Sequence, residues 1–282
     1  MHVLMKLIRK SPGAYLTHFV MIATGLIWIY PFIWMITASF KTNAEYISEG
    51  AGLIPHKIQF GNYFRAWETA NFSVYFINSV IVTLCTVLAV IVVCSLTGYV
   101  LGRYPFPGKM LFIVLITATM FMPKGFTLIP VYTLINSMGL NNSLSGVILA
   151  EIGSAHVLFI LLFTAHFRGL PRDLEEAAEV DGYGFIRTFF SVMLPLSKPI
   201  IATTGIMQFM YSWNSFLIPL VFTLQNEKIR TLGVGMYQFV GENSVDWVGM
   251  AAGACISLIP IILVFIFFQK YFVEGVAGAV KG

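Results

Sequence analysis

The chain has 282 residues, of which 57% are hydrophobic and only 11% are charged. A soluble domain normally carries about a quarter charged residues, so the composition argues against a soluble globular protein and predicts an integral membrane protein. The net charge of +4 is too modest for a nucleic-acid-binding surface, and the basic residues are better interpreted as topology signals.

Six stretches are long and apolar enough to cross a bilayer as helices, which need about 20 residues each. Helices are expected because no stretch shows the alternation of barrel strands. The first stretch has a basic start but is too long for a signal peptide and lacks a cleavage site, so it is interpreted as a retained span. The sequence therefore predicts an all-α, polytopic, single membrane domain over residues 1–282. The predicted spans are residues 14–40, 74–101, 110–135, 144–167, 199–224 and 248–272.

The distribution of Lys and Arg between the loops predicts that both termini are cytoplasmic. The outer side then holds few basic residues, and the polar segment 171–195 lies inside the cell. The inner basic residues are Lys6, Arg9, Lys10, Arg103, Lys109, Arg168, Arg172, Arg187, Lys198, Lys270 and Lys281; the outer ones are Lys41, Lys57, Arg65, Lys228 and Arg230.

Two ionisable residues fall within predicted spans and are candidates for the path of a solute. Lys124 lies in the third span, where Pro123 and Gly125 should break the helix, and Glu151 lies in the outer half of the fourth. Their comparable depth allows an ion pair. A structural pair, or a lysine that reaches toward the outer water, is the alternative to a gate or a contact with a polar solute.

The segment 171–195 is rich in acidic residues, although the chain as a whole has few charges. Pro171 and a capping Asp173 predict a short polar helix over 174–181, which Gly182 should end. Carboxylates near its start favour the positive end of the helix. An amphipathic helix should follow, with Phe185, Ile186, Phe189, Phe190 and Met193 on its apolar face and with Pro195 and Pro199 at its end. Such a capped acidic helix is either a docking element for a soluble partner or a solvated loop.

A cluster of polar side chains lies in the fifth predicted span, at Gln208, Tyr211, Asn214 and Ser215. Three of them share one helical face and could offer amide and aromatic contacts to a sugar. Hydrogen bonding between helices is the equally open alternative.

The sequence shows no set of residues arranged for catalysis, so no catalytic residue is predicted. It contains no GxxxxGK[ST] loop, and ATP binding by this chain alone is not expected. Three cysteines lie in apolar runs and five histidines are scattered, so neither disulfides nor a metal site are predicted.

The acidic segment contains Glu176-Ala177-Ala178, then Gly182 after three residues, then Val192-Met193-Leu194-Pro195 after nine more. This spacing resembles the EAA motif of permease subunits of ATP-binding-cassette (ABC) importers, with Val192 in place of the usual Ile. Tyr211 to Leu220 and the end of the chain, 274–282, are similar to the carbohydrate branch of that family, specifically its MalG-type subunits. The likeness covers most of the chain and implies a type I ABC importer permease fold.

The resemblance implies a coupling helix that seats in a cleft of a separate ATPase. The positions it assigns to this contact, with their acidic neighbours, are Glu176, Ala177, Ala178, Glu179, Asp181 and Gly182. It also implies that ATP and Mg²⁺ are bound by two partner ATPase subunits, and that this chain itself needs no cofactor. A second, MalF-like permease subunit that forms a heterodimer with this chain, and an extracytoplasmic solute-binding protein, complete the expected assembly in a bacterial or archaeal plasma membrane.

Two further segments take expected roles from the resemblance. The C-terminal tail 273–282 should be a thin glycine-containing probe that reaches the ATPases, with a frayed terminus as the alternative. An outer loop should touch the binding protein through Gly241, Glu242 and Asn243, with a solvated loop as the alternative. The implied solute is a sugar, an oligosaccharide or a related polyol.

Two rival functions remain open from the sequence. An ion-coupled secondary transporter would need a self-contained pathway with inverted repeats and buried carboxylates, whereas only Glu151 is a buried acid and no repeat is evident. A membrane enzyme would need a catalytic constellation.

Overall fold

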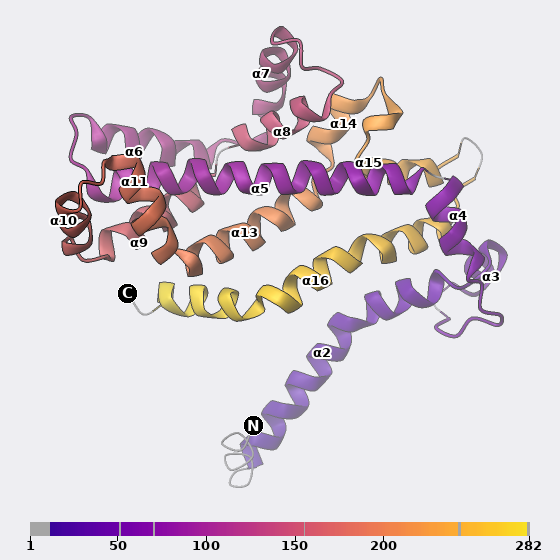
Figure 1. The fold of residues 1–282 in the computed structure, drawn as a ribbon. Helices are drawn as coiled ribbons and strands as arrows, with labels where there is room; N and C mark the ends of the chain where they lie inside the picture. The colour runs from indigo at the N-terminus through magenta and orange to yellow at the C-terminus, as the bar shows by residue number, and fades with distance from the viewer. Residues whose placement is uncertain (1–11, 51, 70, 155, 242–243, 281–282) are drawn as a thin grey trace. The chain divides into compact units, whose positions relative to one another are not determined.

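The computed structural model describes residues 12–50, 52–69, 71–154, 156–241 and 244–280, without the side chains of 12, 69, 124 and 271–280. Within these ranges every element is helical except an isolated bridge between Val240 and Val245. The elements, coloured along the chain in Figure 1, are α2 (Pro12–Ala38), α3 (Asn43–Glu49), α4 (Gly61–Thr69), α5 (Phe72–Arg103), α6 (Lys109–Ala118), η1 (Thr119–Phe121), α7 (Lys124–Ser137), α8 (Leu144–Gly153), α9 (Val157–Gly169), α10 (Asp173–Val180), α11 (Phe185–Thr188), η2 (Phe189–Met193), α12 (Leu194–Leu196), α13 (Lys198–Trp213), α14 (Leu217–Thr223), η3 (Glu227–Ile229), α15 (Leu232–Gly235), η4 (Met236–Phe239) and α16 (Trp247–Val280).

Three helices, α2, α5 and α16, are long and apolar enough to cross a membrane unbroken. Three more crossings are possible where two helices meet at a break and are bent by more than 40°. Among the described residues, the predicted six spans are therefore reached when each bent pair counts as one crossing. The bent pairs are α6–η1 with α7, α8 with α9, and the helical segment 185–196 with α13.

The breaks differ in how well the sequence predicts them. The break before α7 is confirmed, since Pro123 precedes its first residue. The expectation of one continuous helix over 199–224 is wrong, because α13 ends at Trp213 and α14 begins at Leu217. The Asn214 amide donates to the Met210 carbonyl oxygen over 2.8 Å, so a local side-chain bond caps α13 in competition with further helix.

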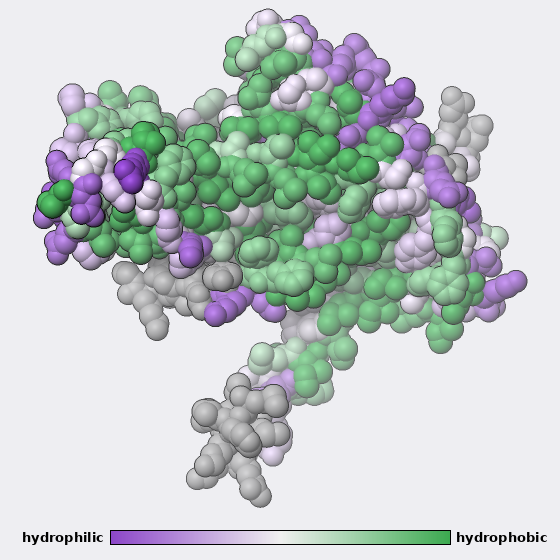
Figure 2. All heavy atoms as spheres, viewed as in Figure 1, coloured by the Kyte–Doolittle hydropathy of each residue, from purple (hydrophilic) through white to green (hydrophobic). Residues whose placement is uncertain are grey.

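The described residues divide into two compact units, one within 71–235 and 259–280 and the other within 12–69 and 236–258. In the first unit, α5 is the central helix and packs against α9 and the segment 185–196. Figure 2 shows hydrophobic residues over α5 and α13 and hydrophilic residues gathered over α10. The buried side chains of the main apolar cluster are Val90, Cys94, Tyr99, Phe159, Phe163, Phe167, Phe189 and Met193.

Helices α5 and α9 approach closely at two glycines one turn apart, Gly98 and Gly102. A Cβ atom at Gly98 would lie 2.5 Å from the Cβ of Phe163 and 2.9 Å from the backbone nitrogen of Thr164. A Cβ at Gly102 would lie 3.0 Å from the Thr164 carbonyl oxygen. Small residues permit this backbone approach in membrane helices, where packing rather than hydrophobicity holds helices together.

The second unit is held by polar contacts around Asp246, just before α16. Its carboxylate forms a 3.0 Å ion pair with Arg65 of α4 and accepts a 2.9 Å hydrogen bond from the Asn43 amide of α3. Lys41 is buried and donates to the Gly52 carbonyl oxygen. Burial raises the pKa of Tyr63 to about 12, which keeps its hydroxyl neutral beside Ser39 at 2.7 Å. These contacts tie the ends of α2 and α16 within this unit.

The C-terminal tail predicted for 273–282 continues α16 as helix through Val280. Residues 281 and 282 lie outside the described residues. The three glycines expected to make this tail thin and flexible therefore include two, Gly275 and Gly278, whose backbone is helical.

Gly98→Ala should destabilise the protein by about 1–3 kcal/mol, because the new methyl group would overlap the backbone and Cβ of α9. The thermal unfolding temperature in detergent is the measurement. Gly205→Ala in α13 is the matched control, since its Cβ would meet only the Cδ1 of Ile91 at 3.4 Å. An unfolding temperature for Gly98→Ala equal to that of the control would contradict the close approach.

Candidate functional site

Helix α10 confirms the predicted short polar helix, shifted by one residue toward the N-terminus. The prediction that Asp173 caps it is wrong, because Asp173 is the first helical residue and Arg172 occupies the cap position. The Arg172 carbonyl oxygen already accepts from the backbone N–H groups of Glu175 and Glu176, so the first turn begins earlier than the sequence pattern indicates. Three acids in this turn lie at the positive end of the helix.

The predicted stop at Gly182 is confirmed, with a φ of +76° that favours glycine. The N–H of Tyr183 donates to the Ala178 carbonyl oxygen at 2.8 Å, and the N–H of Gly182 donates to that of Glu179 at 2.9 Å. These two bonds form a Schellman motif, which satisfies the last carbonyl groups of the helix. Helix α10 is therefore closed at a defined point.

The predicted coupling positions all lie on α10 and its C-terminal cap, and most of them face solvent. Ala178 is only 4% exposed and turns toward the rest of the unit. Val180 is 88% exposed, an unusual position for an apolar side chain beside carboxylates. The exposed predicted residues are Glu176, Ala177, Glu179, Asp181 and Gly182.

One acid on α10 does not face solvent. Glu175 forms an ion pair with Arg103, the last residue of α5, and its other oxygen accepts a 2.8 Å hydrogen bond from the Tyr99 hydroxyl. The charge distribution predicts that Arg103 lies on the inner side, but the sequence gives no sign of this partner, which lies 72 positions away. The acidic residues of α10 thus divide into one that holds the helix to the membrane helices and several that point outward.

The amphipathic helix predicted after Gly182 is confirmed, as α11, η2 and α12 together. Phe189 and Met193 are buried in the main apolar cluster, whereas Phe185, Ile186 and Phe190 are exposed. The stretch Phe189–Met193 is a π-turn. The helix ends at Leu196, between the two prolines predicted at its end, and the 82° bend to α13 comes at Ser197.

The structure brings together two of the residues predicted for the solute path. The Ser215 hydroxyl donates to the carboxylate of Glu151, which is only 4% exposed in α8. Ser215 stands in the break between α13 and α14, so this bond joins that break to the end of α8. Lys124 is the first residue of α7, and its side chain lies outside the described part of the structure. A Lys124–Glu151 pair therefore stays a prediction.

The other predicted path residues do not share one open face. Tyr211 is 55% exposed and Asn214 is also exposed, whereas Gln208 is fully buried. Within the described residues, both amide atoms of Gln208 lack a hydrogen-bond partner, as do the hydroxyl groups of Ser212, Thr83 and Thr86. Ser212, Thr83 and Thr86 are polar residues inside otherwise apolar helices, and this sequence signal could have identified them.

These four side chains lie on two helices that run antiparallel. Gly205 of α13 faces Ile91 of α5, and Trp213 packs edge-on against Phe76 at 5.7 Å between ring centres. Gln208 and Ser212 of α13 and Thr83 and Thr86 of α5 are all buried within this packed pair of helices. Such groups are costly in lipid unless they meet a polar partner.

Of the outer-loop residues predicted to contact a binding protein, the structure describes Gly241. Val240 and Val245 bridge, and the N–H of Gly241 donates to the Ser244 carbonyl oxygen at 2.9 Å. Glu242 and Asn243 lie outside the described residues. Their role stays a prediction.

The sequence predicts no metal site. Among the described residues, one set of three side chains is spaced closely enough to be compared with a metal site. Glu45, Glu49 and His56 have ligand atoms within 4.8 Å of one another. His56 lies 2.5 Å from the Glu49 carboxylate, as an exposed ion pair would. The arrangement is accounted for by that pair.

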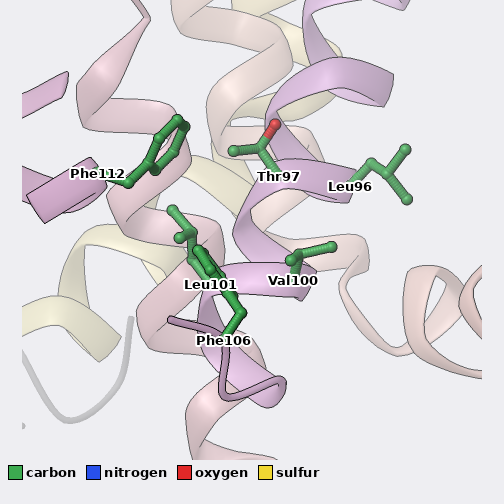
Figure 3. A pocket seen from close by; sticks show the side chains of 6 residues that line it. All are labelled: Leu96, Thr97, Val100, Leu101, Phe106 and Phe112. Atoms are coloured by element: carbon green, nitrogen blue, oxygen red, sulfur yellow. The ribbon is translucent and has the colours of Figure 1, made fainter. Parts of the chain in front are cut away.

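An open apolar groove of about 320 Å³ lies beside α5 and α6, and Figure 3 shows its lining. Thr97 is the only polar residue among Leu96, Thr97, Val100, Leu101, Phe106 and Phe112. The groove offers almost no hydrogen-bonding groups, so its chemistry suits an acyl chain rather than a sugar.

The chain is similar in sequence to known membrane transport proteins. Residues 94–278 match the family described as binding-protein-dependent transport system inner membrane component. The chain is 33% identical to the diacetylchitobiose uptake system permease protein NgcG of Streptomyces coelicolor, over 95% of this chain and 87% of that protein. It is 31% identical to the trehalose/maltose transport system permease protein MalG of Thermococcus litoralis, over 93% and 94% respectively.

A solved structure shows the same fold. It is the crystal structure of a bacterial ABC transporter involved in the import of the acidic polysaccharide alginate, with a TM-score of 0.80 and 23% identity over 93% of this chain and 99% of that one. This likeness confirms the predicted all-α, polytopic, type I importer permease fold.

Gln208→Met should leave the unfolding temperature unchanged or raise it, because an unpartnered buried amide costs free energy that an apolar side chain of similar length does not. Asn78→Leu is the control, since the buried Asn78 amide donates to the carbonyl oxygens of Lys228 and Arg230 at 2.9 and 3.0 Å. The control should lose about 1–3 kcal/mol. An equal loss in Gln208→Met would show that its amide is bonded in the folded protein.

Proposed function

The chain belongs to the family of binding-protein-dependent transport system inner membrane components, and from this premise we propose that it is one of two membrane subunits of an ABC importer for a sugar or oligosaccharide. It is a multi-pass permease subunit, and family members of this kind are transport components rather than enzymes. The proposal assigns it half of the translocation path and one coupling helix. Because the chain belongs to this family, the alternative of an ion-coupled secondary transporter is set aside.

The observation that carries the coupling role is the outward face of α10. Glu176, Ala177, Glu179 and Val180 are exposed together on a short helix that is closed at Gly182 and fixed at Glu175. An exposed valine that adjoins acidic residues in the sequence fits a cleft with an apolar floor and a basic rim. We assign this face to a cleft of an ATPase subunit.

The remaining partners follow from the same proposal. Two ATPase subunits bind ATP and Mg²⁺, so this chain needs no cofactor of its own. A second, MalF-like permease subunit pairs with it, and a solute-binding protein docks on the outer side near Gly241. Both termini are cytoplasmic, which places α10 on the side of ATP.

The solute class is proposed from the relatives and from the polar groups of the bundle. The names of the two relatives above refer to diacetylchitobiose and to trehalose and maltose. Glu151 with Ser215 offers a hydrogen-bonding group at a helix break, the kind of place where transporters meet solutes. A disaccharide or short oligosaccharide is the proposed cargo.

Val180→Asp should weaken association with the ATPase about tenfold or more, because it places a carboxylate, which is costly to desolvate, where the apolar Val180 side chain is proposed to meet an apolar floor. The measurement is the amount of ATPase that co-purifies with the membrane subunits, with ATP-driven uptake in vesicles. The unfolding temperature of this chain should not change, since Val180 is 88% exposed.

Ile54→Asp is the control, because Ile54 is 82% exposed in the other compact unit. It should leave ATPase association unchanged. Normal association in Val180→Asp would count against α10 as the coupling element.

A further inference from the structure

We propose that Arg103 is the positioning residue that makes α10 move as one body with the inner ends of α5 and α9. Its guanidinium joins the three helices, so that a displacement of α10 by a partner is passed to two membrane crossings at one point. The inference rests on the proposed function, because it assumes that an ATPase displaces α10.

The contacts of Arg103 use its whole donor capacity. Its Nε donates to Glu175 Oε2 at 2.6 Å, and its Nη2 forms the ion pair with the same oxygen. Nη1 donates to the carbonyl oxygens of Phe167 and Leu170 at 3.3 and 2.8 Å, and Nη2 donates to that of Pro171 at 3.2 Å. Five contacts match the five N–H groups of a guanidinium.

The carbonyl groups that Arg103 binds lie at the end of α9 and in the link to α10. The last turn of a helix leaves carbonyl groups without intrahelical partners, and a cation there also meets the negative end of the helix dipole. Arg103 therefore caps α9 with one nitrogen and holds α10 with two others. Its side chain is only 6% exposed, so these bonds form away from bulk water, where they are stronger.

Glu175 is held on both oxygens, which fixes its orientation as well as its position. Tyr99, one turn before Arg103 on α5, donates to Oε1, and its ring stacks on Phe185 with 5.4 Å between ring centres. Both ends of the α10 segment are thus attached to α5, by Glu175 at the start and through Phe185 after the cap. The apolar attachment of α10 itself is small, since Ala178 is its one buried residue.

A residue that only stabilised the fold would reduce the amount of assembled complex and change little else. A residue that transmits motion between α10 and the membrane helices would change how strongly the binding protein, on the outer side, stimulates ATP hydrolysis. The ratio of ATPase activity with the binding protein to that with Mg-ATP alone separates these two roles. It is measured on the complete complex in a lipid bilayer.

Glu175→Gln keeps the size of the side chain and removes the charge that Arg103 binds. We expect the complex to assemble, because the outward face of α10 is unchanged, and the stimulation ratio to fall about tenfold. The stimulation ratio of Arg103→Lys should lie between those of Glu175→Gln and the wild type, since a lysine keeps the charge but not the fork of donors. A wild-type ratio in both variants would overturn the proposal.

Glu68→Gln is the matched control, because Glu68 is an exposed glutamate of α4 that lies outside the proposed docking face. It should leave both the ATPase association and the stimulation ratio of the assembled complex unchanged. If the wild-type chain binds no ATPase at all, the proposed function fails and the inference falls with it. If the wild type couples normally and Glu175→Gln does too, only the inference fails.

A distance measurement keeps the inference testable if a variant does not assemble. Spin labels on Asp173→Cys and Val93→Cys, both exposed, report the separation of α10 from α5 in a chain without its three native cysteines. With intact Arg103, this distance should stay the same with and without ATP and vanadate. A shift between the two conditions would show that α10 moves separately from α5.

Discussion

The close packing of α5 against α9 is the constraint on which the rest of the first compact unit depends. Gly98 and Gly102 let the two backbones approach, since a Cβ at Gly98 would collide with α9 and one at Gly102 would make a tight contact with it. Because the two helices lie so near, the last residue of α5 reaches the end of α9 and the start of α10 with one side chain. A larger separation would leave Arg103 short of the carbonyl groups it caps and would leave Glu175 without its partner.

The bundle also tolerates several interruptions that lipid should penalise. A broken helix frees backbone groups, and membrane proteins allow this only where protein or water satisfies them. Here local side chains do part of this work, since the Asn214 amide caps α13 and the Ser197 hydroxyl bonds back to the Met193 carbonyl oxygen. The break after α13 also releases Ser215 to meet Glu151, so an irregular stretch of backbone serves to partner a buried carboxylate.

How much of the structure the sequence could predict depends on how many neighbouring residues each sequence signal covers. The acidic helix, its end at Gly182 and the break at Pro123 depend on local rules of backbone geometry, and these are confirmed within one residue. Hydrophobic runs predict how many crossings there are, but not that three of them are bent. Hydropathy averages over about 20 residues, whereas a break is decided by two or three residues and their neighbours in space.

Which face of a helix is buried, and which residues that face contacts, could be learned only from the tertiary structure. Helical spacing places Gln208, Tyr211 and Ser215 on one side of a helix, but it does not say which part of that side meets α5. The structure buries Gln208 and exposes Tyr211, one turn away. In the same way, the local sequence gives no sign that Glu175 turns toward the bundle and meets Arg103.

The difference between those two adjacent glutamates is the step that links fold to function. On a helix, successive residues point about 100° apart, so one of the pair turns to the bundle when the other turns to solvent. The inward position, occupied by Glu175, meets a buried arginine and a tyrosine, while the outward position is left for a partner. A short helix can transmit force only if it is held on one face and free on the other, and this alternation of two like charges provides both conditions within a single turn.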